Sequence, residues 1–387
     1  MGSPDCRTKA VAGVNRVRGL SERVAFKPTP RVAIVGMGPI GCAAAAFLVR
    51  SGHRPAVWSP TGRRLHQEGG HASVACVGAV EGRIEFERLA SPERLADFPV
   101  VLVCLPANAY AAVLGPLNAH WRSGQHVILS GALSLAPLWI VAAAKGIQVT
   151  GWGTTLTTTH FLPDGTLHVN PLRDRIDMAT VGAPEPASAL RDCEELFGAR
   201  FVVAASLLTP ALANINPIAH AAEVIPNLTR MESGKAWSLF GNFTPAVGRL
   251  AESLDKERRA IAHGFGLQVP SLRQHYARSY HVPEGPLHTI AAAIVSKGMS
   301  PDGPAALHHR YVLEDAPFGL AFLEALGRVA EVRTPVLTAC LTVLAATYGR
   351  DFRADNFLLD SLNIAGAEAK ALLARCAASA SPASLTR

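Results

Sequence analysis

The residues best suited to chemistry in this chain include a histidine at the start of a predicted helix. In Asn216-Pro217-Ile218-Ala219-His220, Asn is a favoured N-cap and Pro fits the first helical position. His220 is therefore expected about one turn into the helix, on the face above Asn216. A purely structural histidine is the alternative. The catalytic interpretation needs a second group that fixes the imidazole.

That second group is predicted in His309-Arg310-Tyr311-Val312-Leu313-Glu314-Asp315. A carboxylate bonded to one imidazole nitrogen selects the tautomer and raises basicity, and the other nitrogen stays available for substrate. Asp315 is the predicted partner of His220, and Glu314 is the alternative. Arg310 is placed to bind an anion, either a substrate carboxylate or a cofactor pyrophosphate. A surface ion pair is the alternative for Arg310.

A Gly-rich turn predicts a dinucleotide site. The buried-strand run Val32–Val35 leads into Gly36-Met37-Gly38-Pro39-Ile40-Gly41, and an Ala-rich helix follows. The first glycine allows the tight turn, the second admits the pyrophosphate, and the third lets helix and strand pack closely. The free N–H groups of the helix start suit phosphate. The predicted cofactor residues here, with two at the end of the strand near residue 100, are Gly36, Gly38, Pro39, Ile40, Gly41, Leu105 and Pro106.

The end of the second predicted strand, Ala56-Val57-Trp58, indicates which dinucleotide binds. An NAD enzyme usually has Asp or Glu there for the ribose 2′-OH. This chain has Ser59-Pro60-Thr61-Gly62-Arg63-Arg64 instead. Ser59, Thr61, Arg63 and Arg64 could hold a 2′-phosphate, since a guanidinium fork suits phosphate. NADP(H) is therefore predicted in preference to NAD(H), and a solvated loop is the alternative for the arginines.

The elements that must position these residues fall into two groups. Strands alternate with helices from Arg31 to about residue 206, which predicts a Rossmann-type doubly wound parallel sheet. Helical spacing dominates residues 207–376, so an all-α second domain is predicted. We expect a disordered basic leader over 1–30 and a flexible tail over 377–387.

Composition excludes several classes of protein. The net charge is +7, but residues 1–30 hold six basic and two acidic residues and so account for more than half of this excess. The rest of the chain has no basic cluster with interleaved aromatic residues, so nucleic-acid binding is not predicted. The seven cysteines show no disulfide or metal spacing, which indicates a reducing, cytoplasmic location and no metal site. The uncharged run from Val127 to Ala144 is broken by Gly131 and Pro137, so no membrane span is predicted. For residues 1–30 a transit peptide is the alternative to a disordered leader. The sequence is also compatible with a homodimer.

From Arg31 to about residue 370 the chain resembles the opine dehydrogenases, and within them the crown-gall octopine and nopaline synthases. The resemblance rests on the Gly-rich turn and on four further elements, Asn214-x-Asn216-Pro217-x-Ala219-His220, Leu254-Asp255-x-Glu257-Arg258, His309-Arg310-Tyr311-x-x-Glu314-Asp315 and Ser361-Leu362-Asn363. It implies a Rossmann domain, a helical domain and an active site in the cleft between them. The implied reaction is NADPH-dependent reductive condensation of an amino acid with an α-keto acid, pyruvate or 2-oxoglutarate, through an imine to a secondary-amine dicarboxylate.

The resemblance assigns the catalytic histidine to His220, its partner to Asp315 and the interdomain arginine to Arg310. Asn216 is expected to orient substrate, and Thr157 and Thr158 to line the nicotinamide side of the cleft, with a plain polar strand as the alternative. Acids for a basic substrate side chain could be Glu223, Glu232 or Glu314. Two other functions stay open, namely a ketopantoate-reductase-like enzyme using Lys145, Lys235 or Lys297, and a nonenzymatic NADP sensor.

Overall fold

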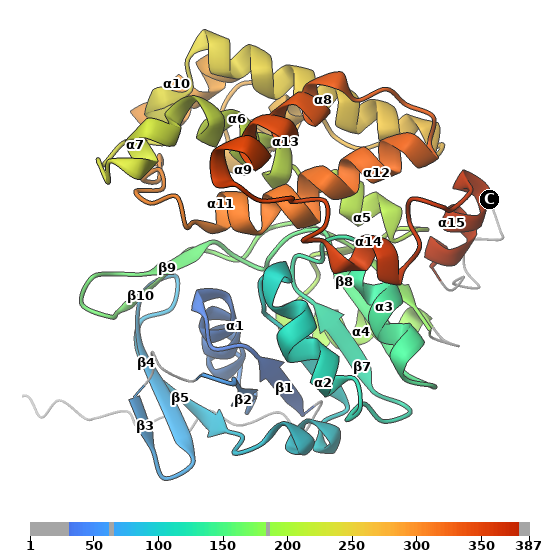
Figure 1. Ribbon diagram of the computed structural model, residues 1–387. Helices are drawn as coiled ribbons and strands as arrows, with labels where there is room; N and C mark the ends of the chain where they lie inside the picture. Colours follow the sequence, from blue (N-terminus) through green and yellow to red (C-terminus); the bar gives the residue numbers. More distant parts are fainter. Residues whose placement is uncertain (1–30, 62–65, 183–185, 379–387) are drawn as a thin grey trace, which may run out of the picture.

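The structure is a computed structural model that describes residues 31–61, 66–182 and 186–378. Two layers of the molecule follow the order of the sequence. The strands lie between residues 32 and 203, and the part after residue 207 is helical. In Figure 1 the helical half, yellow to red, sits on top of the sheet half, blue to green. The predicted α/β class with a helical second half is therefore confirmed.

One sheet contains all the strands of the described residues, in the order β12-β11-β8-β7-β6-β1-β2-β5-β4-β10-β9, with β3 paired to β4. Its centre is the parallel set β1, β2, β6, β7 and β8, as a Rossmann-type sheet requires. The strands are β1 Val32–Val35, β2 Ala56–Trp58, β3 His66–Glu68, β4 His71–Gly78, β5 Gly82–Arg88, β6 Val100–Val103, β7 His126–Leu129, β8 Gln148–Trp152, β9 Thr159–Phe161, β10 Leu167–Val169, β11 Ile176–Val181 and β12 Phe201–Val203.

The sheet is dominated by parallel pairs, as predicted, but it also contains antiparallel strands. β4 runs antiparallel to both β3 and β5, β9 runs antiparallel to β10, and β11 runs antiparallel to β8. Along β4 and β5 buried residues alternate with exposed ones over much of each strand. Such strands carry a weaker apolar signal than the fully buried central strands, because one of their faces is in water.

Alternating side chains of β1 enter two different cores. Val32 and Ile34 join the cluster beneath α1 (Pro39–Arg50), whereas Ala33 and Val35 face the opposite side of the sheet. The remaining helical segments of this half are η1 Pro92–Asp97, η2 Ala107–Ala109, η3 Tyr110–Leu114, α2 Gly115–Leu117, α3 Ala136–Ala143 and α4 Pro186–Phe197. Both faces of the central strands are thus covered, and this explains their near-continuous apolar sequences.

The helical half begins at Leu208, after a connection of four residues (204–207) from the end of β12. Its first helical stretch is divided by a break at residues 214–215 and by the 3-10 segment that contains Pro226. Its elements are α5 Leu208–Ala213, α6 Asn216–Val224, η4 Ile225–Asn227, α7 Leu228–Glu232, η5 Phe240–Asn242, α8 Pro245–Gly264, α9 Leu272–Tyr280, α10 Leu287–Ser296, α11 Arg310–Leu313, η6 Ala316–Ala321, α12 Phe322–Val329, α13 Pro335–Tyr348, α14 Phe357–Ser361 and α15 Ala369–Cys376.

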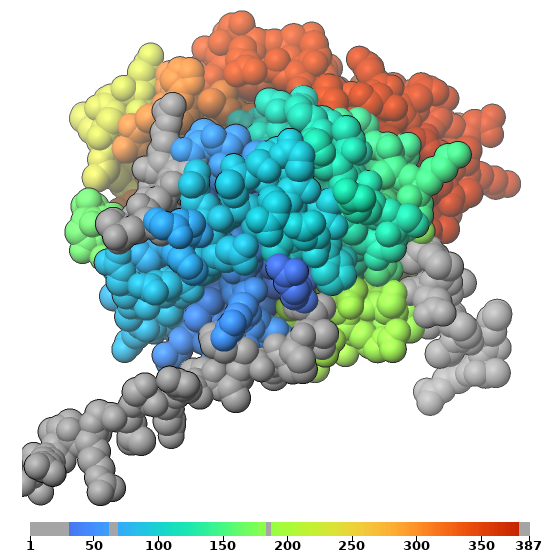
Figure 2. All heavy atoms as spheres, turned by 90° about the horizontal axis from the view of Figure 1, so that it is seen from below, coloured from blue at the N-terminus to red at the C-terminus, as the bar shows by residue number. Residues whose placement is uncertain are grey.

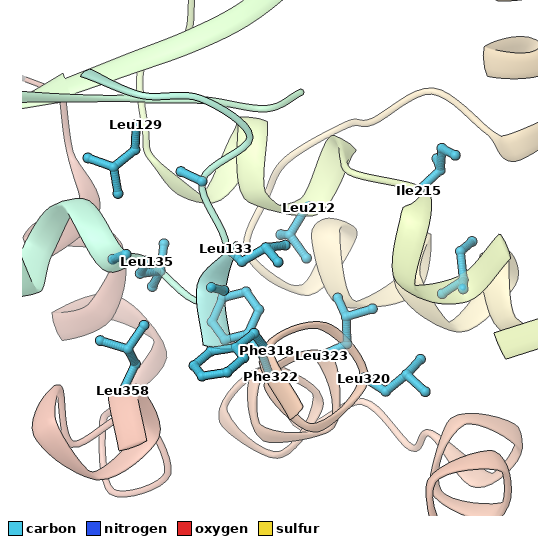
Figure 3. Close-up of a cluster of buried hydrophobic side chains, with 14 of the residues drawn as sticks. Leu129, Leu133, Leu135, Leu212, Ile215, Phe318, Leu320, Phe322, Leu323 and Leu358 are labelled. Carbon is cyan, nitrogen blue, oxygen red and sulfur yellow. The ribbon is translucent and has the colours of Figure 1, made fainter. Parts of the chain in front are cut away.

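The two halves share one apolar core. In Figure 3, Leu133 and Leu135 from the β7–α3 connection lie beside Phe318 and Phe322 of the helical half. The neighbouring hydroxyl of Ser134 donates to the Phe318 carbonyl at 2.6 Å. From below, in Figure 2, the sheet half fills most of the face and the helical half forms its far edge. The shared core holds the elements on either side of the interface in a fixed relation.

Two terminal expectations meet the structure only in part. Residues 1–30 and 379–387 lie outside the described residues. Ala377 and Ala378, which the prediction assigned to the flexible tail, instead pair with the chain at Ser206 and Ala205. Among the helices of the described residues, none combines the length and apolar character that crossing a bilayer requires.

Candidate active site

The structure brings His220 and Asp315 together, 95 residues apart in sequence. The Nδ1 atom of His220 lies 2.6 Å from Oδ2 of Asp315, and both side chains are buried. The Nε2 atom of His220 has no hydrogen-bond partner among the residues that the structure describes. A carboxylate on Nδ1 favours the proton there and leaves Nε2 for exchange with a substrate. The pair therefore has the geometry of a general acid/base.

The start of α6 differs from the prediction in one detail. The side-chain oxygen of Asn214, not that of Asn216, accepts the backbone N–H of Asn216 at 3.0 Å. Asn216 is already the first helical residue, and Pro217 occupies the next position, where no N–H is needed. The N-cap position is Ile215, which makes no side-chain cap bond, so the predicted N-cap at Asn216 is wrong by one residue. An Asx turn at Asn214 starts the helix instead.

Close packing of α6 against η6 sets the distance between His220 and Asp315. A Cβ atom on Gly319 would lie 2.3 Å from Cγ of Pro217, so only glycine allows this approach. Phe318 and Asn356 tie η6 to the sheet half through Ser134: the Asn356 amide donates to Ser134 Oγ at 3.0 Å and to the Pro317 carbonyl at 2.9 Å. Asp315 thus sits on a segment that is fixed from two sides.

Tyr311 fixes the plane of the imidazole. Its ring stacks on that of His220 with centroids 3.5 Å apart and 11° between the planes. His309 packs edge-on against Tyr311 at 4.6 Å, and its Nδ1 accepts the Tyr311 N–H at 3.4 Å. Burial, followed by the charges of His220 and Arg310, lowers the pKa of His309 to about 4. At neutral pH His309 is therefore an uncharged neighbour of the pair.

Glu314, the alternative partner for His220, has a different function in the structure. Its Oε1 accepts the backbone N–H of Ala107 at 2.9 Å, and its Oε2 accepts Nε–H of Arg310 at 2.9 Å. Ala107 follows directly on Leu105 and Pro106 at the carboxyl end of β6. Glu314 thus joins the helical half to the edge of the sheet where cofactors bind in such folds, and Asp315 is left for the imidazole.

The Gly-rich turn has the shape that a pyrophosphate needs. Gly36 has φ +106°, and a Cβ there would lie 2.5 Å from the Cys104 carbonyl oxygen. A Cβ on Gly41 would lie 1.9 Å from the Gly36 carbonyl oxygen, which explains the close contact of helix and turn. A Cβ on Gly38 would meet nothing within 4 Å. The open side of Gly38 faces the N-terminus of α1, where Pro39 comes first and the N–H groups of Ile40 and Gly41 follow.

The predicted 2′-phosphate residues are described only in part. The N–H of Gly36 donates to the Trp58 carbonyl at 2.8 Å, which places the end of β2 beside the Gly-rich turn. Ser59 is partly buried and Thr61 is exposed at this end. Arg63 and Arg64 lie outside the described residues.

The threonines predicted to line the cleft have intramolecular partners. Thr157 is buried, and its hydroxyl donates to the Asn170 carbonyl at 2.7 Å. The exposed Thr158 accepts the Asn170 amide at 2.7 Å. Both side chains hold the loop after β8 against the segment after β10. Glu232 is exposed on α7, and the three lysines of the reductase alternative, Lys145, Lys235 and Lys297, are exposed as well.

Glu223, one of three acids that the sequence offered for a basic substrate side chain, is buried near the His220–Asp315 pair. Glu223 lies one turn beyond His220 on α6 and is 2 % exposed. Tyr276 donates to its Oε1 at 3.3 Å, and its Oε2 is buried with no partner among the described residues. Burial raises the pKa of Glu223 to about 8, the Tyr276 bond lowers it, and Asp315 raises it further. In the sequence, the spacing of three residues from His220 was the signal that the two side chains would be neighbours on one helix.

The Asp255–Arg258 motif is structural. Arg258 is fully buried, and it donates to Asp255 at 2.6 Å and to the Pro270 carbonyl at 2.6 Å. Glu257 accepts the N–H groups of Val336 and Leu337, both at 2.8 Å, and so caps α13. These contacts join α8 to its neighbours and lie apart from the His220 pair. Among the described residues, no group of three or more potential metal-ligating side chains occurs.

Comparison with known proteins agrees with this arrangement. Residues 203–348 match the model of the NAD/NADP octopine/nopaline dehydrogenase alpha-helical domain, and this range contains His220, Arg310 and Asp315. An opine dehydrogenase of Arthrobacter sp. (strain 1C) is 29% identical over 344 residues, which cover 86% of this chain and 95% of the relative.

Two solved structures share the fold. An octopine dehydrogenase in a structure with NADH and L-arginine superimposes with a TM-score of 0.72 at 15% identity, over 89% of this chain and 98% of that one. A yersinopine dehydrogenase bound to NADP⁺ superimposes with a TM-score of 0.64 at 16% identity, over 90% and 98% of the two chains. The domain match, the relative and the common fold agree with one another: the chain is similar to the opine dehydrogenases in its helical domain, over most of its length and in its fold.

Proposed function

We propose that this protein is an NADPH-dependent opine dehydrogenase that joins the amine of an amino acid to an α-keto acid, pyruvate or 2-oxoglutarate, and reduces the resulting imine. The product is a secondary-amine dicarboxylate. The observation that carries the proposal is the buried His220–Asp315 pair, in which Asp315 directly follows Glu314, the residue bonded to Ala107 at the cofactor edge of the sheet. A relative with the name opine dehydrogenase matches nearly its whole length.

The roles follow from proton and charge requirements. A nicotinamide dinucleotide, when bound, supplies the hydride that reduces the imine carbon. The turn at Gly36, Gly38 and Gly41 would hold its pyrophosphate, and Leu105 and Pro106 border the same edge. His220 protonates the carbinolamine hydroxyl so that water can leave, and Asp315 stabilises the imidazolium that this step requires.

The remaining residues orient the substrates. The Arg310 side chain is about half exposed, and only its Nε is engaged by Glu314, so its other nitrogens can bind a substrate carboxylate. Asn216 is partly buried one turn before His220 and presents an amide to the same region. Thr157 and Thr158 shape the loop after β8.

The proposed NADPH preference predicts the effect of one substitution. An aspartate at Ser59 would place a negative charge where the 2′-phosphate is expected and would provide an acceptor for a 2′-OH. We expect Ser59→Asp to weaken NADPH binding by at least about tenfold and to leave NADH binding equal or stronger. Fluorescence titration of both cofactors measures this. Ser59→Asn, which has the same shape without the charge, is the control and should retain the NADPH preference.

The proposal is tested by following NADPH oxidation over a grid of amino acids against pyruvate and 2-oxoglutarate. At least one pair should give stoichiometric oxidation, with a secondary-amine dicarboxylate identified by mass spectrometry. NADPH binding without oxidation by any pair, or reduction of a keto acid alone to its alcohol, would refute the opine reaction.

A further inference from the structure

Arg173 is a cation of the sheet half that the reaction proposed for His220, Asp315 and Arg310 does not use. It follows β10 and is partly buried. Its Nε donates to the Thr155 carbonyl at 3.0 Å, and its own N–H donates to the Leu156 carbonyl at 2.8 Å. The loop that holds it starts at the carboxyl end of β8. Ligands of doubly wound sheets bind outside these strand ends.

The charge of Arg173 is not neutralised within the described part of the chain. No carboxylate of the described residues forms an ion pair with it, and its terminal nitrogens have no hydrogen-bond partner there. His275 is close, but burial, followed by Arg173, Arg258 and Arg278, lowers the pKa of His275 to about 4. The imidazole is therefore neutral at pH 7. An arginine that is partly buried without a counter-charge indicates an anionic ligand, since burying an unpaired charge is costly.

Tyr280 links Arg173 to the candidate active site. Burial, followed by Glu223, raises the pKa of Tyr280, and Arg173 lowers it, so this hydroxyl is close to both groups. Glu223 in turn is one turn from His220 on α6. The Tyr280 ring also packs edge-on against Tyr276 at 6.0 Å, and the Tyr276 hydroxyl donates to Glu223, so contacts lead from Tyr280 to the helix that carries His220.

The chemistry of the proposed product explains why a second arginine is needed. A secondary-amine dicarboxylate carries two carboxylates on either side of one nitrogen, and Arg310 can bind only one of them in a two-pronged manner. We infer that Arg173 binds the second carboxylate, that of the amino-acid substrate, from the sheet side of the cleft. This inference rests on the proposed function for the identity of the anion.

Binding of iminodiacetate tests the inference without turnover. This compound is the smallest molecule with two carboxylates around a secondary amine, and it can be titrated calorimetrically into NADPH-saturated protein. We expect Arg173→Gln to weaken its binding by roughly 10- to 100-fold, the effect of a lost charge-assisted hydrogen-bond pair. Arg173→Lys should fall between the two, because an ammonium replaces the fork by a point charge.

Two controls separate ligand binding from a structural effect. Arg175→Gln removes a neighbouring arginine that is exposed and paired with Asp177 at 2.8 Å, and it should bind iminodiacetate like the wild type. NADPH affinity and the melting temperature of Arg173→Gln should match the wild type. Unchanged iminodiacetate binding would overturn the inference, and so would a loss accompanied by equal losses in NADPH affinity and stability. Wild-type protein that binds iminodiacetate but oxidises NADPH with no substrate pair would refute the proposed function and not this site.

Discussion

Replacing His220 with alanine should reduce turnover by roughly 10²–10⁴-fold, the usual contribution of a general acid/base. The side chain is stacked on Tyr311 and bonded to Asp315, so its removal takes away the proton donor and leaves a buried carboxylate without a partner. The Gly-rich turn lies on another element, so NADPH affinity should stay at the wild-type value. Steady-state rates with the best substrate pair and a cofactor titration measure both.

Asp315→Asn provides the matched test of the pair. Residues that act as a unit give losses that are not additive, so the double variant should be no slower than His220→Ala alone. His71→Ala, an exposed histidine on β4, is the control for loss of an imidazole elsewhere. Wild-type turnover in His220→Ala, or fully additive losses in the double variant, would contradict the assigned roles.

The Glu223→Gln variant should be more stable than the wild type at high pH, and the difference should grow as the pH rises. The carboxyl has a pKa of about 8 in the folded chain against 4.5 when exposed. Below pH 4.5 it is protonated in both states and contributes nothing. Between these values the unfolded chain loses its proton while the folded chain retains it, so wild-type stability falls with rising pH. The difference should reach the order of a few kcal/mol above pH 8.

Urea unfolding of Glu223→Gln and wild type at pH 4.5, 7 and 8.5 tests this. The two midpoints should converge at the lowest pH and separate as the pH increases. Glu81→Gln, a change on an exposed turn, should follow the wild type throughout. A separation that stays constant across these pH values would show that folding does not raise the pKa of Glu223, and it would contradict the prediction.

The central strands were predictable because burial on two faces makes them uniformly apolar. The runs at Val32, Ala56 and Val100 lie where the sequence predicted strands. The antiparallel strands β4 and β5 were missed because their side chains alternate between protein and water over much of their length, and β9 because it is only three residues long and begins in a threonine run.

The His220–Asp315 contact was predicted from the need of an imidazole for a carboxylate. The sequence favoured Asp315, but its spacing alone could not exclude Glu314, because the directions of two adjacent side chains depend on the course of the backbone. The engagement of Glu314 by Ala107 decides it. Arg173 had no local signal at all, because its significance is the absence of a counter-charge after folding.

The contact between Glu314 and Ala107 has a consequence for engineering. Exchanging the helical half with that of a relative is usually planned at the connecting segment, here residues 204–207. The contact that decides whether such a chimaera works is the hydrogen bond between the Ala107 amide and Glu314. This bond sets the position of Glu314, and Asp315 is the next residue along the chain. A donor half whose acid cannot reach that amide would fold and still present its histidine to an empty carboxylate position. Recombination designs should therefore be screened first for geometry at residue 107.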